Sequence, residues 1–323
     1  MVETPKVSVI ICAYSMERFA DVLEAIDSAL TQTLSPHQVI VSIDHNRELM
    51  EKLKGQIPPS VLLVFNDGDR GTPETRNIGV RVATGDILAF MDDDAVAEND
   101  WLEKLVQPFE TRAVAATGGK ISPRWLDDSG RPAWFPEELD WIVGCTYPGL
   151  PQRGRQVRNV ISCNMACRAD TLKRVGLFLN PGGKVGKTGM REDTEICMRI
   201  KHQIPEALII YEPRAIVHHK VTFQRTKFRY FLQRSYEEGC LKSAIKRLYS
   251  TSANKSLSAE SSYLRYLLFT AIPQRLTRLY QGRSFLQLGT LFTCIAATGA
   301  GYLRGQMRWE RTKLENSGEE RRT

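Results

Sequence analysis

Four short apolar runs, separated by segments with helical spacing, divide the first 92 residues of this 323-residue chain. The first run, residues 7–13, is continuously apolar and rich in β-branched residues, which is typical of a parallel strand buried on both faces. Further runs follow at 39–43, 61–65 and 87–91. Helices are expected between them, at 19–34 and from Pro73 to Gly85, with Thr72 as the cap of the second. The alternation predicts an α/β fold whose ligands bind at the carboxyl ends of parallel strands.

The pattern is less regular after residue 101. Strands are expected at 157–167 and 208–217, and helices at 193–201 and 227–248. Residues 125–151, rich in Pro, Gly, Asp and Trp, are expected to form a long ordered loop, and the Gly/Lys-rich stretch 180–189 a mobile one.

Composition limits the class of protein and its compartment. With 42% hydrophobic and 25% charged residues the chain can bury a core, which excludes a disordered or fibrous protein. Its seven cysteines include no C-x-x-C pair, which indicates a reduced compartment and no zinc ribbon. The first 19 residues contain Glu3 and only a short apolar run, so a signal peptide is not expected and the chain is predicted to lie on the cytoplasmic side.

Positive charge is concentrated in the last hundred residues. Residues 1–223 hold 26 Lys and Arg against 30 Asp and Glu, whereas residues 224–323 hold 18 against 7. Between 261 and 309 there are six arginines and no acidic residue, interleaved with Leu, Phe and Tyr, which suits an anionic membrane surface. No nucleic-acid-binding signature accompanies this basic stretch, so a nucleic-acid partner is not expected.

A composition change near residue 250 divides the chain into a predicted catalytic domain, 1–250, and a basic, apolar helical region, 251–323, that associates with the membrane. Residues 284–303 are uncharged and long enough to span a bilayer. Glycines, threonines and a glutamine offset the gain from the apolar residues, so the free energy of insertion is expected to be near zero. We therefore expect short helices, broken at Pro273 and near Gly282, that lie in the interface as a peripheral, monotopic anchor. A single transmembrane span is the alternative.

Three consecutive aspartates, Asp92, Asp93 and Asp94, follow the fourth expected strand directly. Carboxylates this close repel one another and raise each other's pKa unless a cation or solvent compensates. Mg²⁺ or Mn²⁺, held by carboxylates and substrate phosphates, is the natural partner. A solvated acidic turn is the alternative, but the carboxyl end of a buried parallel strand is where such a sheet binds ligand, which favours a metal site.

Two further positions carry side chains suited to this chemistry. Asp44 ends the second expected strand and can accept hydrogen bonds from a base or ribose, while Arg76 can pair with a phosphate. Glu192 and Asp193 open a helix after the Gly/Lys stretch and offer a carboxylate general base on a segment that can close over substrate. A surface location for the first pair, and an ordinary helix-dipole role for the second, are the alternatives.

These motifs occur in the same order and rough spacing in the family 2 glycosyltransferases, which the chain resembles over residues 5–245. The matching segments are Ala13-Tyr14-Ser15, Asp44, Arg76-Asn77, Phe90-Met91-Asp92-Asp93-Asp94 and Glu192-Asp193. The resemblance implies a GT-A fold, in which a Rossmann-like, mostly parallel sheet is flanked by helices. It also implies a nucleotide-diphospho-sugar donor, a divalent cation and inversion at the anomeric carbon.

The resemblance implies a role for each matching residue as well. The donor site would comprise Ala13, Tyr14, Asp44, Arg76, Asp92 and Asp93. The metal would be held by Asp92, Asp94 and His219, with His219 preferred over its neighbour His218. Asp193 would be the catalytic base. The acceptor side is expected to include Glu192, Trp134, Trp141 and Tyr147. Sugars pack on aromatic faces, although burial in a loop core is the alternative for the aromatic residues.

Two departures from the family pattern, and one closer match, refine the expected substrate. His45 stands where many members have a second Asp after the base-binding one, so this departure concerns recognition of the base. Residues 231–239 lack the Q-x-x-R-W motif of processive members, which predicts transfer of a single sugar. Residues 134–138, 141–149 and 157–161 resemble prokaryotic members that glycosylate lipid-linked acceptors, including archaeal glucosyl-dolichyl-phosphate glucuronosyltransferases. The expected reaction is inverting transfer from a UDP-sugar to a lipid-linked or cell-envelope polysaccharide acceptor at the cytoplasmic face of the membrane.

Two other functions stay open. A sugar-1-phosphate nucleotidyltransferase would need a Gly-rich basic loop near the N-terminus, which Ala13-Tyr14-Ser15-Met16 does not supply. A non-catalytic, membrane-bound sugar-nucleotide binder would not need the pair Glu192-Asp193. A donor-hydrolysis assay separates such a binder from an enzyme.

Overall fold

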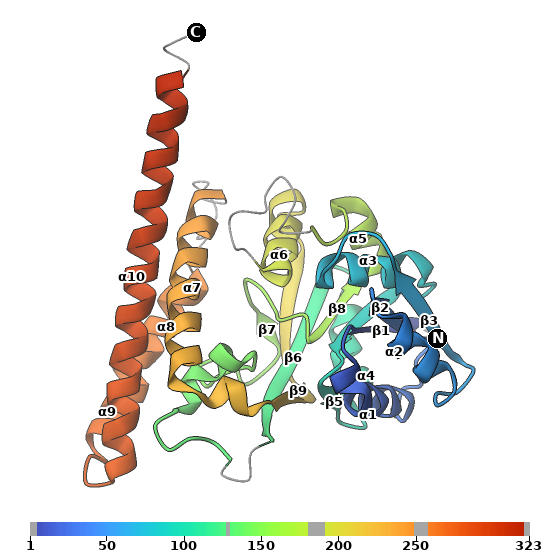
Figure 1. The fold of residues 1–323 in the computed structure, drawn as a ribbon, viewed down its shortest axis with the longest axis horizontal. Coiled ribbons are helices and arrows are strands. Elements are labelled where there is room, and N and C mark those ends of the chain that lie inside the picture. The colour runs from blue at the N-terminus through green and yellow to red at the C-terminus, as the bar shows by residue number, and fades with distance from the viewer. Residues whose placement is uncertain (1–4, 127–129, 180–190, 249–257, 320–323) are drawn as a thin grey trace.

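The computed structural model describes residues 5–126, 130–179, 191–248 and 258–319, and its centre is one sheet with helices on both faces (Figure 1). The strands are β1 (Val7–Ala13), β2 (Gln38–Asp44), β3 (Val61–Asn66), β4 (Ile87–Asp92), β5 (Ala95–Ala97), β6 (Val114–Trp125), β7 (Arg155–Gln156), β8 (Asn164–Arg168) and β9 (Leu208–Val221). Their order across the sheet is β3-β2-β1-β4-β8-β6-β9-β5, with β7 beside β9.

Helices cover the sheet and extend beyond it at its β9 end. They are α1 (Phe19–Leu30), α2 (Arg47–Lys54), α3 (Thr72–Val82), α4 (Trp101–Val106), α5 (Ala169–Val175), α6 (Glu192–Gln203), α7 (Phe228–Leu248), α8 (Ser258–Tyr266), α9 (Ile272–Leu276) and α10 (Gly282–Glu319). The predicted α/β fold, a sheet flanked by helices with a helical C-terminal tail, is confirmed.

The four predicted N-terminal strands form the parallel half of the sheet. β1 lies between β2 and β4 and pairs with both in parallel. Its side chains alternate between two cores: Val9 and Ile11 pack with α1, whereas Ile10 packs with α5 and α6 on the other face. Burial on both faces explains why the run is continuously apolar. The other half is mixed, since β8 is antiparallel to β4 and β6, while β6 and β9 run parallel.

The start of α3 differs from the prediction. Thr72 is the first helical residue and makes no capping bond with its side chain; Gly71 is the N-cap, with a φ of 117°. A side chain at that φ is strained, so glycine suits the position. Its N–H donates to Asp44 Oδ2 at 3.0 Å, which ties the helix start to the end of β2.

Several elements beyond residue 101 were predicted wrongly or not at all. The strand expected at 157–167 is confirmed only as Asn164–Arg168, because residues 157–163 leave the sheet and line cavities. The strands β6 and β7 and the short helices α4 and α5 were not predicted, and neither were α2 and β5, which precede residue 101. The loop expected at 125–151 contains a 3₁₀ helix, Glu137–Val143. The stretch 180–189 and the composition change near residue 250 lie outside the described residues.

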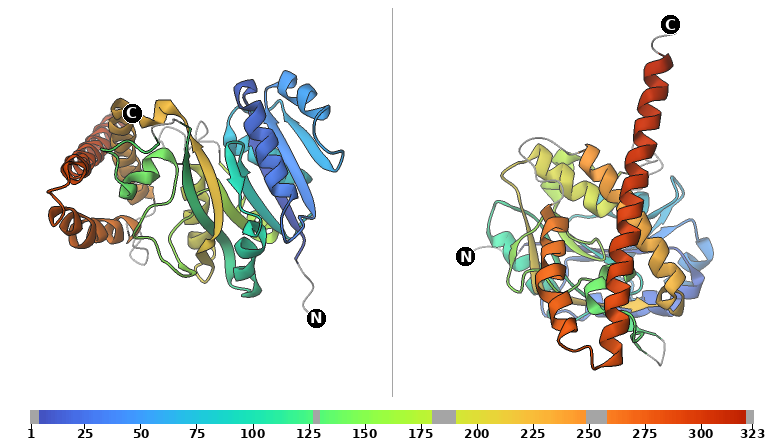
Figure 2. Two further views of the ribbon diagram at one scale, coloured as in Figure 1. Left: turned by 90° about the horizontal axis from the view of Figure 1, so that it is seen from below. Right: turned by 90° about the vertical axis from the view of Figure 1, so that its left-hand side faces the viewer.

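The C-terminal helices pack on the rest of the molecule. Figures 1 and 2 show α10 alongside α7, at the end of the molecule opposite β3. The two helices touch at glycines: a Cβ added at Gly301 would lie 2.0 Å from the carbonyl oxygen of Tyr236. Leu267, Ile272 and Leu291 belong to the same buried cluster as β1 and α1.

The tail has fewer breaks than the sequence predicted. A break before Gly282 is confirmed. Pro273, in contrast, does not break the helix, because it lies in the first turn of α9, directly after a π-helical turn. Proline has no backbone N–H, and at this position its absence costs no helical hydrogen bond. α10 continues to Glu319, so it is not short. Among the described helices, one segment, Gly282–Met307, is long and apolar enough to cross a membrane. In its apolar stretch of 18 residues, 28% is buried against the rest of the protein.

Candidate active site

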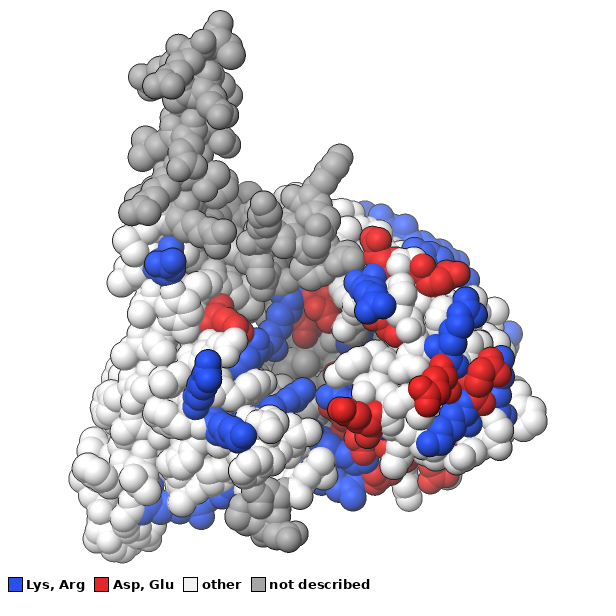
Figure 3. Space-filling view, viewed as in Figure 1, with Lys and Arg blue, Asp and Glu red and all other residues white. Residues whose placement is uncertain are grey.

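Two cavities meet at the carboxyl edge of the parallel strands. The smaller, of about 470 Å³, lies at the ends of β1, β2 and β4 and the start of α3. The larger, of about 1470 Å³, lies between residues 146–161 and the helices α7, α8 and α10. Ile161, Arg191 and Asp193 line both. Figure 3 shows a hollow at the centre of this face, with basic and acidic side chains around it.

The three consecutive aspartates lie in the smaller cavity, and arginines from other elements neutralise them. Arg18 Nη1 lies 2.7 Å from Asp93 Oδ1 and 3.0 Å from Asp94 Oδ2. Arg76 Nη2 lies 3.0 Å from Asp92 Oδ1. Burial raises the pKa of Asp93 to about 7 despite Arg18. Two arginines therefore relieve part of the repulsion within the cluster, which was expected to need an outside cation or solvent.

A metal ion nevertheless fits the remaining donor atoms. In the described part of the chain, the buried Oδ1 of Asp94 has no hydrogen-bond partner and lies 3.4 Å from Nε2 of His219. Ligand atoms of Asp92, Cys163 and His219 also lie within 4.8 Å of one another. Burial lowers the pKa of His219, which keeps the ring neutral and able to ligate. The donor set suits a divalent cation.

Cys163, which the sequence analysis missed, is the poorer ligand. Burial raises the pKa of its thiol well above the ordinary range, so it stays protonated, and hard cations such as Mg²⁺ prefer oxygen. His218 lies on the other side of β9 and contacts Glu98 at 3.1 Å. The structure therefore brings Asp92, Asp94 and His219 together, and not His218.

Three of the predicted donor-site residues line the smaller cavity. Ala13, Tyr14 and Asp44 all line it. Both carboxylate oxygens of Asp44 are in use, because Oδ1 accepts from Asn66 Nδ2 at 2.9 Å and Oδ2 accepts from the N–H of Gly71. The ring of Tyr14 is exposed, with the guanidinium carbon of Arg18 5.2 Å from its centre. Tyr14 thus offers a free aromatic face to a ligand.

Arg76 joins the strand end to the start of α6. It is buried, and its Nη1 donates to Glu192 Oε1 at 2.6 Å while Nη2 pairs with Asp92. Two carboxylates therefore already hold the guanidinium that was expected to bind phosphate. Glu192, predicted on the acceptor side, lines the smaller cavity and not the larger.

Asp193 lies in the first turn of α6, at the junction of the two cavities. Its Oδ1 accepts from the N–H of Thr194 at 2.6 Å and its Oδ2 from the N–H of Ser162 at 3.4 Å. Burial, and then the charge of Glu192, raise the pKa of Asp193 above that of an exposed aspartate. A carboxylate with a raised pKa binds a proton more tightly than an exposed aspartate does, so it is the stronger base.

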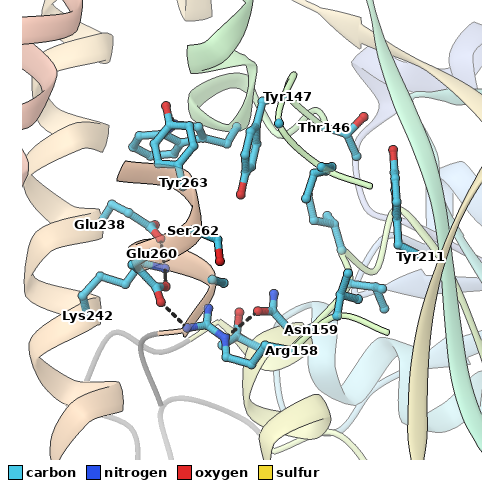
Figure 4. Close-up of a pocket in the computed structure, with 18 of the residues that line it drawn as sticks. Thr146, Tyr147, Arg158, Asn159, Tyr211, Glu238, Lys242, Glu260, Ser262 and Tyr263 are labelled. Carbon is cyan, nitrogen blue, oxygen red and sulfur yellow. Dashed lines mark hydrogen bonds and ion pairs between the residues drawn. The ribbon is translucent and has the colours of Figure 1, made fainter. Parts of the chain in front are cut away.

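The aromatic residues expected to form an acceptor platform divide into two groups. Trp141 and Tyr147 line the larger cavity, where Trp141 Nε1 donates to Tyr263 Oη at 3.1 Å. The rings of Tyr147 and Tyr263 are 4.7 Å apart and face the same space (Figure 4). Trp134 lies outside the two cavities and packs edge-on against Phe135, Phe228 and Phe231. Trp134 is partly buried among these rings, as the loop-core alternative expects, whereas Trp141 and Tyr147 line a cavity.

Sequence reasoning missed Arg18, Arg191, Arg225 and Arg234, all of which line the smaller cavity. Arg18 follows β1 by five residues, a position at which a charged side chain can reach the same sheet edge. Arg191 precedes α6 directly, Arg225 lies in the short 3₁₀ helix before α7, and Arg234 lies in α7 itself. Nothing in their local sequence marks them, because their place depends on how those segments pack.

Comparisons with known proteins agree with this geometry. The model of the family "Glycosyl transferase family 2" matches residues 8–176. A glucosyl-dolichyl phosphate glucuronosyltransferase of Haloferax volcanii is 35% identical over 93% of this chain and 96% of its own. Succinoglycan biosynthesis protein ExoM of Rhizobium meliloti is 25% identical over 73% and 74% of the two chains.

Solved structures show the same fold at low sequence identity. A mannosyltransferase from Pyrobaculum calidifontis, in complex with GDP-mannose and Mn²⁺, aligns over 97% of this chain and 81% of its own, with a TM-score of 0.56 and 16% identity. The GalNAc-transferase GalNAc-T7, with UDP, GalNAc and Mn²⁺, aligns over 84% and 57% of the two chains, with a TM-score of 0.51 and 16% identity. Both are GT-A glycosyltransferases, so this chain has the GT-A fold.

Proposed function

Because the chain belongs to glycosyl transferase family 2, we propose that it transfers one sugar, with inversion, from a nucleotide-diphospho-sugar, foremost a UDP-sugar, to a lipid-linked acceptor. The observation that carries this proposal is the position of Asp193, which lies between a small acidic cavity and a large cavity next to the C-terminal helices. The name of the 35%-identical relative supports a dolichyl-phosphate-linked acceptor.

The smaller cavity is the proposed donor site. Asp92, Asp94 and His219 would hold Mg²⁺ or Mn²⁺, which when bound neutralises charge on the diphosphate leaving group. Arg18 and Arg76 fix the carboxylates in place through ion pairs of 2.7 to 3.0 Å. The base would lie towards Tyr14 and Asp44, at the other end of the cavity.

Asp193 is the proposed catalytic base. The N–H groups of Ser162 and Thr194 orient its carboxylate, and its raised pKa prepares it to take the proton of an acceptor hydroxyl. The hydroxyl oxygen then attacks the anomeric carbon, and the bond to the diphosphate breaks on the opposite face, which inverts the configuration. Asp193 suits this geometry because the proposed donor site lies on one side of it and the larger cavity on the other.

A glucuronate-type donor suits the charge at the Asp193 end of the donor cavity. Arg191, Arg225 and Arg234 line it together with Tyr230. In the described residues, Arg191 Nη2 and Arg234 Nε are buried without a hydrogen-bond partner, and Arg191 Nη2 lies 3.9 Å from Glu238 Oε2. A sugar carboxylate would satisfy such donors, and the name of the Haloferax relative supports the same sugar.

The experiment incubates purified protein with a panel of nucleotide sugars, a glycosyl lipid phosphate and Mg²⁺ or Mn²⁺. Nucleotide release identifies the donor, NMR gives the anomeric configuration and mass spectrometry counts the sugars added. One added sugar with an inverted anomer is expected. A retained anomer or a ladder of products would refute the corresponding part of the proposal. Nucleotide-sugar synthesis from a sugar 1-phosphate, or binding without turnover, would instead support one of the two alternative functions.

We also propose that residues 1–250 form the catalytic domain and that residues 251–323 hold the protein on the cytoplasmic face of the membrane as a monotopic anchor. Large apolar side chains at the α9–α10 end of the tail support this placement, because Phe269, Tyr280 and Phe285 are exposed. Arg278 and Arg283 lie among them in the sequence and suit anionic head groups.

A further inference from the structure

The C-terminal helices form part of the wall of the larger cavity, and we infer that this cavity binds the sugar and phosphate of a lipid-linked acceptor. In this inference, which rests on the proposed function, the tail is part of the substrate site and not only an anchor. This part of the wall includes Glu238 and Lys242 of α7, Glu260 and Tyr263 of α8, and Cys294, Ile295, Thr298, Gly299 and Tyr302 of α10. Tyr147, Arg158 and Asp193, which precede the tail in the sequence, line the same cavity, and Figure 4 labels the first two.

The tail is fixed to the catalytic fold by polar contacts that a simple anchor would not need. Arg275 of α9 makes two parallel bonds to Glu138, at 2.7 and 2.6 Å, and both side chains are largely buried. Tyr263 Oη donates to the carbonyl oxygen of Glu138 at 2.8 Å and accepts from Trp141. The cavity wall is therefore preorganised, as a binding site requires.

The charges in the cavity suit a phosphate. Its described lining includes six basic side chains and three acidic ones. Arg158 pairs with Glu260 at 2.5 Å, and Lys242 lies 2.6 Å from Glu238 and 2.7 Å from Glu260. This network keeps two cations on the cavity wall in fixed positions, where a phosphate can join them.

Sugar and lipid each have a suitable neighbour in the same space. The rings of Tyr147 and Tyr263 offer aromatic faces to a sugar in the cavity that Asp193 also lines. Leu264, Leu267 and Ile295 give the cavity an apolar side towards α8 and α10. At about 1470 Å³ the cavity is larger than one sugar needs, so it can also hold a phosphate and the first isoprene units. A neutral polysaccharide end would use neither the excess of cations nor the apolar side.

The test uses an acceptor that needs no membrane: a glycosyl phosphate of a short isoprenoid alcohol, compared with the neutral glycoside of the same alcohol. Binding to the full-length protein is measured by calorimetry, and transfer by the KM for acceptor. The wild-type protein should bind the phosphate form at least about 10-fold more tightly. Lys242→Met should raise the acceptor KM about 10-fold or more, and Lys242→Arg should restore most of the affinity. Arg229→Met, a change of an exposed cation on the same helix, should have no effect.

Three outcomes would overturn the inference. Equal affinity for the glycosyl phosphate and the neutral glycoside would show that the cavity has no phosphate site. An unchanged KM in Lys242→Met with the soluble acceptor would exclude the network of Lys242, Glu238 and Glu260 from the acceptor site. A parallel loss of thermal stability in Lys242→Met and Lys242→Arg, with affinity lost in both, would make the role of Lys242 structural. Failure of the proposed function looks different, because the acceptor would bind while no nucleotide sugar is turned over.

Discussion

The two carboxylate oxygens of Asp94 have different surroundings. Oδ2 pairs with Arg18, while Oδ1 has no hydrogen-bond partner among the described residues and lies beside His219. A metal bound there would be lost if the carboxylate became an amide. We expect Asp94→Asn to lower transfer by at least about 100-fold and to weaken Mn²⁺ binding, measured by calorimetry. Chelation should have the same effect on the wild type; full activity in excess chelator would contradict the metal assignment.

Asp193 should affect the rate of reaction more than the binding of the donor. Asp193→Asn keeps the size of the side chain but removes the proton acceptor, so turnover should fall by about 100-fold or more with little change in donor affinity. Steady-state kinetics with each substrate varied in turn separate the two quantities. A variant that loses donor binding but keeps turnover at saturation would show that Asp193 is a donor contact.

The pKa of Asp193 predicts the acid side of the pH profile. The base must be deprotonated, and burial raises its pKa above that of an exposed aspartate, about 3.9. Activity is therefore lost as pH falls through the raised pKa, at a higher pH than an ordinary aspartate would give. The profile of kcat/KM for acceptor should show this limb. A limb at or below pH 4 would argue against Asp193 as the base.

The sequence identified those site residues that stand directly at the ends of regular elements. Asp44, Asp92 and Asp193 were found because a strand end or a helix start is visible in the pattern of apolar residues. Arg18 and Cys163 were not, since their contacts join segments about 55 to 75 residues apart. The partners of Arg76 and the burial of Trp134 likewise depend on tertiary packing.

At the scale of elements, strands buried on both faces were the easiest to predict. β6 was missed because it contains Gly118, Gly119 and Pro123, which hide its strand pattern. The glycines are needed where other segments approach closely: a Cβ at Gly118 would lie 2.3 Å from Val160. The same cause, close approach to a neighbour, places Gly301 on α10.

The packing of α10 on α7 predicts opposite effects for two glycines of one helix. A Cβ at Gly301 would collide with the backbone of Tyr236, so Gly301→Ala should push the helices apart and destabilise the protein. At Gly299 a Cβ would meet no heavy atom within 4 Å, so Gly299→Ala should stabilise the helix by about 0.5–1 kcal/mol. Thermal unfolding in detergent measures both. Equal shifts in the two variants would contradict the packing.

At the scale of the whole molecule, the exposed apolar side chains of the tail should control membrane binding. Phe269 is 77% and Phe285 69% exposed, and burying one phenylalanine contributes about 1.5–3 kcal/mol. Phe269→Glu combined with Phe285→Glu should lower binding to anionic vesicles by at least about 100-fold in a flotation assay. Leu62→Glu, on β3 at the other end of the sheet, is the control. Unchanged flotation of the double variant would exclude this surface.

The packing of α10 also bears on whether the tail spans the bilayer. The 26 residues Gly282–Met307 extend about 39 Å at roughly 1.5 Å per residue, enough to cross a hydrocarbon core of about 30 Å. One face of α10, however, lies against α7, which carries Arg234, Glu237 and Lys242. If α10 crossed the membrane in this packing, those charges would enter hydrocarbon, where each costs several kcal/mol.

A monotopic tail avoids that cost, because α10 then lies at the surface with its free face in the lipid interface and α7 towards water. We expect a tag at the C-terminus to be protected from protease added outside spheroplasts and to become accessible once the cells are opened. A tag at the N-terminus, expected on the same side, serves as the matched control. Cleavage of the C-terminal tag alone in intact spheroplasts would show that α10 spans the membrane, and that it separates from α7 to do so.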